Sequence, residues 1–116
     1  MTEMLKVTVD RRHPMAVIYT EGYINNQGGE EIARVAYDLI DDDHKVLLLN
    51  LQGTKIVNSI GISILIEIIE KMLEIDGRLA FCNLTPTIEK TFHIMGLAQY
   101  AKIYPDEGVA IGELSG

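Results

Sequence analysis

The chain has 116 residues, 47% of them hydrophobic and 23% charged, which is the balance of one ordinary globular domain. Its formal net charge is −7 and its ten Lys and Arg residues are scattered, so the sequence offers no basic surface for nucleic acid or an anionic membrane. It also has no apolar run near the roughly 20 residues that span a bilayer and no secretory pattern at its start, so we expect a single cytoplasmic domain over residues 1–116.

The first 43 residues predict a hairpin followed by a helix. Apolar residues alternate with polar ones over 5–9, as in a half-buried strand, and 15–19 is its expected partner. From Glu30 the apolar residues recur with the period of one buried helix face. This face consists of Ile32, Val35, Ala36, Leu39 and Ile40. The acidic run 41–43 is expected to end the helix in a solvated loop.

Strands and helices then alternate. The segment 46–51 is almost continuously apolar, which is typical of a central strand buried on both faces. After a loop around Gly53, the pattern predicts a helix over 60–75 and a strand over 79–82.

Thr85 is the expected N-cap of a further helix, with Pro86 at its first position and Gly96 as its C-cap. Ile103 and Tyr104 indicate a last short strand. This order predicts an α/β fold: a mixed β-sheet with an N-terminal hairpin and helices covering largely one face.

Ser59 lies between the central strand and the next helix, where backbone N–H groups are unpaired and the helix dipole is positive. Phosphorylation there would add a charge of roughly −1.5 to −2, which those N–H groups can hold without unfolding the domain. Such a site works as a switch that a partner detects. Spacing alone favours a simpler interpretation, in which Ser59 is only an N-cap.

An enzymatic interpretation rests on the order strand, serine, glycine, which is similar to the G-x-S-x-G nucleophile elbow. Val57 replaces the first glycine, and the sequence gives no argument for a histidine that activates Ser59.

The single cysteine, Cys82, allows no internal disulfide and is expected to lie buried in its strand. We therefore predict no catalytic residue, metal or cofactor.

The helix after Ser59 has two apolar stripes. Its broad core face consists of Ile62, Leu65, Ile66, Ile69, Met72 and Leu73. The second stripe consists of Ile60, Ile64, Ile68 and Ile75. We expect Ile68 to belong to the core, whereas Ile60 and Ile64 fit either a core contact or an exposed patch for a partner.

The sequence resembles the anti-sigma factor antagonists of the STAS-domain family at three places. The segment Asn58-Ser59-Ile60-Gly61-Ile62 is similar, in frame, to the family motif Asp-Ser-Ser-Gly-Leu, in which the first serine is phosphorylated. The segment 82–97 resembles the family's strand, proline-capped helix and Gly-Leu terminus, and 22–25 resembles its Gly-Glu-Leu-Asp turn. Asn25 and Asn58 stand where the motifs usually have Asp, and Ile60 replaces the second serine.

The resemblance implies a non-enzymatic partner switch in bacterial transcription regulation. The unphosphorylated domain would bind an anti-sigma factor that is also a serine kinase, and so free a sigma factor. Phosphorylation of Ser59 would break the complex, and a phosphatase would restore it. The expected partner-binding residues are Asn25, Asn58, Ser59, Ile60, Gly61 and Ile64.

We expect the chain to be a monomer or weak dimer with protein partners only, and neither nucleic acid nor membrane among them. Two alternatives stay open. In the first alternative, the chain is a regulatory or scaffold STAS module of a pathway without a sigma factor. In the second, it is a serine hydrolase.

Overall fold

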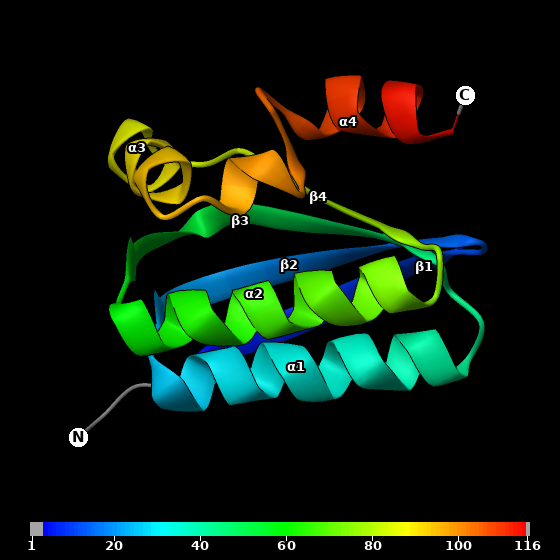
Figure 1. Cartoon of the computed structure of the whole chain (residues 1–116), viewed down its shortest axis with the longest axis horizontal. Coiled ribbons are helices and arrows are strands. Elements are labelled where there is room, and N and C mark those ends of the chain that lie inside the picture. Colours follow the sequence, from blue (N-terminus) through cyan, green and yellow to red (C-terminus); the bar gives the residue numbers. More distant parts are fainter. Residues whose placement is uncertain (1–3, 116) are drawn as a thin grey trace.

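The computed structural model describes residues 4–115, which form one five-stranded sheet with helices on both of its faces (Figure 1). In chain order the elements are β1 (Lys6–Arg12), β2 (Met15–Ile24), α1 (Asn26–Asp41), β3 (Val46–Val57), α2 (Ser59–Glu74), β4 (Arg78–Cys82), α3 (Pro86–Ile94), the 3-10 helix η1 (Leu97–Gln99), β5 (Lys102–Tyr104) and α4 (Glu107–Leu114). None of these helices is long and apolar enough to cross a membrane.

The strands lie in the order β1-β2-β3-β4-β5. β1 and β2 form the antiparallel N-terminal hairpin, and β2, β3, β4 and β5 are parallel to one another. The predicted mixed α/β sheet is therefore confirmed. Because β2, β3 and β4 run in the same direction, their C-terminal ends lie along one edge of the sheet, where α1, α2 and the chain toward α3 begin.

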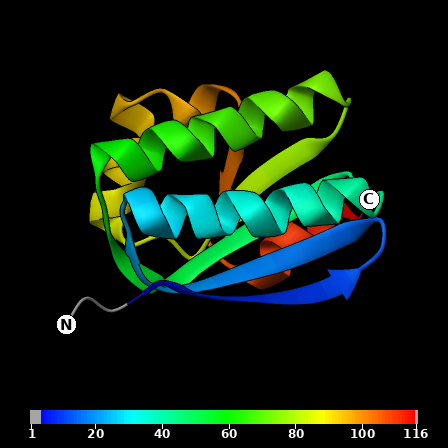
Figure 2. The same ribbon diagram turned by 90° about the horizontal axis from the view of Figure 1, so that it is seen from below.

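The larger core lies under α1 and α2, which run side by side across one face of the sheet (Figures 1 and 2). α3 and η1 extend the same core through Ile88, Phe92 and Leu97. Phe92 meets Phe81 of β4 edge-to-face, with ring centroids 4.9 Å apart. The predicted coverage of largely one face is confirmed.

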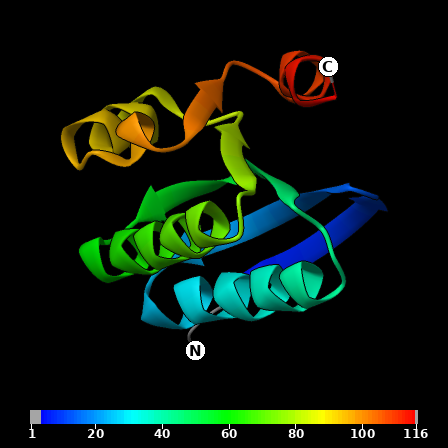
Figure 3. The ribbon, with the colours of Figure 1, turned by 45° about the vertical axis from the view of Figure 1, so that its right-hand side comes forward.

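α4 was not predicted, and it packs on the opposite face of the sheet (Figure 3). A second core lies beneath it, and this core consists of Met15, Val17, Leu48, Ala80, Cys82, Ala110 and Leu114. Asp106 begins the helix as its N-cap, because its Oδ1 accepts a hydrogen bond from the Val109 N–H at 2.9 Å. Cys82 is fully buried here, as predicted.

The expected loop around Gly53 is wrong, because β3 continues to Val57. Thr54 within this extension is fully buried, and its hydroxyl lies 2.6 Å from that of Thr20 on β2. That buried pair holds the two strands together across the irregular register of this region. Leu73 also departs from the prediction, since it is 53% exposed although it belongs to the predicted core face.

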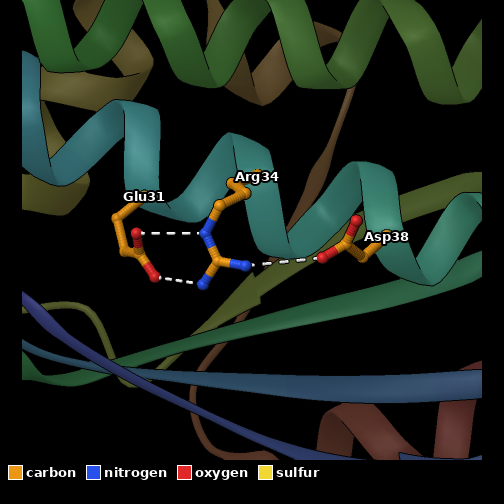
Figure 4. A network of polar contacts seen from close by, with 3 residues as sticks. All are labelled: Glu31, Arg34 and Asp38. Atoms are coloured by element: carbon orange, nitrogen blue, oxygen red, sulfur yellow. Dashed lines mark hydrogen bonds and ion pairs between the residues drawn. The ribbon is translucent and has the colours of Figure 1, made fainter.

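The solvent side of α1 carries a small ion-pair network (Figure 4). The Arg34 guanidinium lies between Glu31 and Asp38, with N···O distances of 2.5 and 3.4 Å. The hydrogen bond from Arg34 lowers the pKa of Glu31 below its usual value. Exposed pairs of this spacing stabilise a helix only weakly, so the packing of α1 on the core contributes more.

Candidate functional site

Two strand-to-helix turns lie next to each other at one edge of the sheet. β2 and β3 are parallel, and their last residues, Ile24 and Val57, are register partners. Asn25 and Asn58 follow these strands directly, and the Asn58 N–H donates to the Ile24 carbonyl oxygen at 3.1 Å. The two turns therefore lie side by side, and Figure 2 shows α1 and α2 starting at the same end.

Both helices begin with the same cap. The Asn25 Oδ1 accepts from the Gly28 N–H, and the Asn58 Oδ1 accepts from the Gly61 N–H, each at 2.8 Å. The interpretation of Ser59 as an N-cap is therefore wrong, because Asn58 already has that role. Both turns share the pattern Asn-x-x-Gly.

Ser59 is the first residue of α2, and its side chain is exposed. Within residues 4–115, its hydroxyl makes no side-chain hydrogen bond, and no histidine bonds to it. His44 Nδ1 lies instead 3.2 Å from the Leu39 carbonyl oxygen, and His93 Nε2 lies 3.7 Å from Glu89. The arrangement leaves the Ser59 hydroxyl open to an outside reagent.

The electrostatic surroundings of Ser59 favour an added negative charge. α1 and α2 present their N-terminal ends at the same edge of the sheet, and neither has an acidic residue in its first turn. The two caps are neutral amides. A phosphate on Ser59 would therefore meet two positive dipole ends and no carboxylate in either first turn.

Gly61 is buried, and its lack of a side chain allows the first turn of α2 to touch β2. A Cβ on Gly61 would overlap the Ile24 carbonyl oxygen and lie 2.9 Å from Ile24 Cγ2. Gly61 therefore positions the segment that carries Ser59, and its own surface is not available to a partner.

The second apolar stripe of α2 divides after its first residue. Ile60 is 51% exposed beside Ser59. Ile64 is half-buried and packs on Gly29 of α1, where a Cβ would lie 2.8 Å from Ile64 Cδ1. Ile68 is fully buried, as expected. Within the stripe, Ile64 thus contacts α1, Ile68 belongs to the core, and Ile60 is the exposed member near Ser59.

Sequence reasoning missed two exposed apolar residues near this edge, Tyr23 on β2 and Ile56 on β3. They are register partners and are 41% and 58% exposed. The strands predicted from the sequence ended before Tyr23 and Ile56, so no sequence signal marked this pair; in the structure their neighbours Ile24 and Val57 face the larger core.

Comparisons with known proteins agree with this architecture. The family model described as the STAS domain matches residues 6–110, which is most of the chain. A protein of Bordetella bronchiseptica named "Putative anti-sigma factor antagonist BtrV" is 22% identical over 101 residues, covering 87% of this chain and 84% of the relative.

Two solved structures have the same fold. An anti-sigma factor antagonist from Mycobacterium paratuberculosis superposes with a TM-score of 0.84 at 19% identity, covering 97% of this chain and 95% of that one. The phosphorylated form of the Bacillus cell fate determinant SpoIIAA superposes with a TM-score of 0.73 at 19% identity, covering 94% and 99%. On the family match, the chain belongs to the STAS-domain family.

Proposed function

We propose that this chain is an anti-sigma factor antagonist that acts by partner switching, with Ser59 as the phosphorylated residue. The observation that carries the proposal is the exposed Ser59 hydroxyl at the first position of α2, relieved of the capping role by Asn58. The names of the relatives support the same class of function.

In this mechanism the unphosphorylated domain binds an anti-sigma factor that is also a serine kinase, and a sigma factor is freed. The kinase supplies ATP, magnesium and the base, while Ser59 Oγ only accepts the phosphoryl group. A phosphatase removes that group and restores binding. The domain itself catalyses nothing.

The phosphate acts on the complex and not on the fold. Negative charge at a helix N-terminus is favourable, so α2 stays formed after phosphorylation. A docked partner would have to desolvate a group of roughly −1.5 to −2 charge, and a nearby acidic group on the partner would be repelled. One small modification therefore produces a large change in affinity.

The proposed contact surface consists of Asn25, Asn58, Ser59 and Ile60, with the exposed part of Ile64 at its border. The first four belong to adjacent turns, joined by the hydrogen bond from the Asn58 N–H to the Ile24 carbonyl oxygen. The neutral rim and single exposed isoleucine suit a partner that docks tightly and is expelled by one phosphate.

The test begins with capture of host proteins on the wild-type chain and identification of any bound serine kinase by mass spectrometry. The purified kinase should incorporate phosphate into wild type and not into Ser59→Ala. Ser63→Ala is the matched control, because Ser63 is an exposed serine one turn later on the same helix. It should still be phosphorylated.

Calorimetry with the same kinase then compares the unphosphorylated and phosphorylated chains. We expect phosphorylation to weaken binding by about a hundredfold or more, the scale of a charge buried without a partner. Equal affinity of the two forms would refute the switch. A kinase that binds and phosphorylates the chain but releases no sigma factor would instead favour a STAS module of another pathway.

A further inference from the structure

A hollow lies on the open face of the sheet, next to the edge that carries Ser59. Its volume is about 180 Å³, and its lining residues are Gly22, Tyr23, Gly53, Lys55 and Ile56. We name it the sheet-end hollow. Ile24 and Val57 point into the core under α1 and α2, so their neighbours Tyr23 and Ile56 point to the opposite face.

The hollow stays uncovered because α4 packs elsewhere on this face. The core beneath α4 is built on Met15, Val17 and Leu48, near the beginnings of β2 and β3. Tyr23 and Ile56 lie at the far ends of the same strands and remain 41% and 58% exposed. Two adjacent apolar side chains are thus left in solvent.

The local backbone forms the hollow. The register between β2 and β3 shifts twice, between Tyr19 and Glu21 and between Glu21 and Tyr23. Gly22 has φ +124°, a conformation that residues with side chains rarely adopt, and Gly53, the register partner of Glu21, adds no side chain of its own. Irregular strand pairing of this kind often re-aims side chains beside functional sites.

The hollow lies close along the chain to the contact surface around Ser59. Ser59 lies three positions after Ile56, so their Cα atoms are at most about 11 Å apart. A single standard protein interface buries about 800 Å² on each partner, which is wide enough to cover both places.

Lys55 gives the hollow a charge preference. Among residues 4–115, no carboxylate lies within ion-pair distance of Lys55, so its ammonium is open to a partner, as those of the other lysines are. In a chain of net charge −7, this cation beside two apolar side chains is complementary to an acidic group on a partner.

We propose that the sheet-end hollow binds the anti-sigma factor kinase itself, through an aliphatic side chain seated on Tyr23 and Ile56 and a neighbouring Asp or Glu paired with Lys55. This inference rests on the proposed function. The contact also strengthens the switch, because a phosphate on Ser59 would lie within the same interface as the partner's carboxylate and repel it.

The test uses the purified kinase and the unphosphorylated chain. Ile56→Glu should weaken binding about tenfold or more, since it places a charge in the apolar contact. Ile56→Ala should weaken it less. Val109→Glu is the matched control, because Val109 is a β-branched residue on α4 with 45% exposure. It should bind like wild type.

Lys55→Gln tests the ionic part. It should slow association and flatten the dependence of affinity on salt concentration, because the pair with the partner's carboxylate is lost. Wild-type salt dependence in Lys55→Gln would overturn the carboxylate assignment. Circular dichroism of every variant verifies the fold.

The outcomes separate this inference from the proposed function. If Ile56→Glu and Ile56→Ala bind like wild type while phosphorylated Ser59 loses binding, the hollow is not part of the interface and the switch stands. If phosphorylation of Ser59 leaves the affinity unchanged, the switch fails, whatever the Ile56 variants do.

Discussion

At the scale of single residues, Asn58 caps α2, and the neighbouring Ser59 is left as the proposed phosphorylation site. The Asn58 Oδ1 holds the Gly61 N–H at 2.8 Å, so the Ser59 hydroxyl is not needed to begin the helix. Phosphorylation of Ser59 then removes no cap. This division keeps the free energy of unfolding separate from the state of the proposed switch.

The cap can be tested directly. Asn58→Ala should lower the free energy of unfolding by about 0.5–2 kcal/mol, because the Gly61 N–H loses its acceptor. Asn58→Asp should keep the cap and gain about 0.3–1 kcal/mol from the helix dipole. Urea unfolding followed by circular dichroism measures both changes.

Asn26→Ala is the control for that experiment, since Asn26 is an exposed asparagine at the first position of α1 with no capping bond. Its urea midpoint should stay close to wild type. A midpoint for Asn58→Ala as high as that of Asn26→Ala would show that α2 does not depend on this cap.

Residue types alone did not resolve which residue caps α2, because Ser and Asn are both strong N-caps and stand side by side at 58 and 59. Gly61 fixes where α2 begins, because a side chain at this position would overlap the Ile24 carbonyl oxygen. That contact is long-range in sequence, so spacing within the helix could not reveal it.

At the scale of elements, α4 shows where sequence patterns fail. It has eight residues, two of them glycine, so its intrinsic helix propensity is low. The helix is stabilised from outside, by burial of Ala110 and Leu114 and by a hydrogen bond from Asn50 Nδ2 to Glu107 Oε1 at 2.9 Å. The one local signal was Asp106 as an N-cap after Pro105.

Removing the Glu107 carboxylate should loosen α4. In Glu107→Ala the Asn50 amide loses its acceptor, and α4 should open more often from the sheet. Cys82 lies beneath this helix, so its labelling by a thiol reagent in the native state should become several-fold faster.

Glu113→Ala is the matched variant, because Glu113 is an exposed glutamate on the same helix. It should leave the labelling of Cys82 as slow as in wild type. Equal labelling rates for Glu107→Ala and Glu113→Ala would show that the bond to Asn50 does not hold α4 in place.

At the scale of the whole molecule, the mixed sheet with its N-terminal hairpin followed from the order of the apolar segments, whereas the strand order β1-β2-β3-β4-β5 came from the structure. The sequence did not show how far β2 and β3 stay paired. Gly53 suggested a turn, but the buried contact between Thr20 and Thr54 keeps the strands together to Val57. The sheet-end hollow depends on that extension, so it was hidden from sequence reasoning as well.

Two groups link the stability of the whole domain to alkaline pH. Burial, followed by the neighbouring carboxylate of Glu107, raises the pKa of Tyr19 and that of Cys82 to about 12 each. In the unfolded chain these groups titrate near pH 10 and 8.5. Between the unfolded and folded values, the folded state therefore binds more protons than the unfolded state.

The sign of the pH dependence follows from that difference. When the folded state holds more protons, the free energy of unfolding falls as pH rises. The stabilisation from both groups is complete below about pH 8.5 and is lost progressively toward pH 12.

Tyr19→Phe removes the phenol and keeps the ring, so between about pH 10 and 12 its urea midpoint should decline less steeply than that of wild type. Cys82 is present in both chains, and the difference in slope therefore isolates Tyr19. Parallel slopes would mean that the Tyr19 phenol titrates alike in the folded and unfolded chains, and that its burial beside Glu107 does not favour the protonated form.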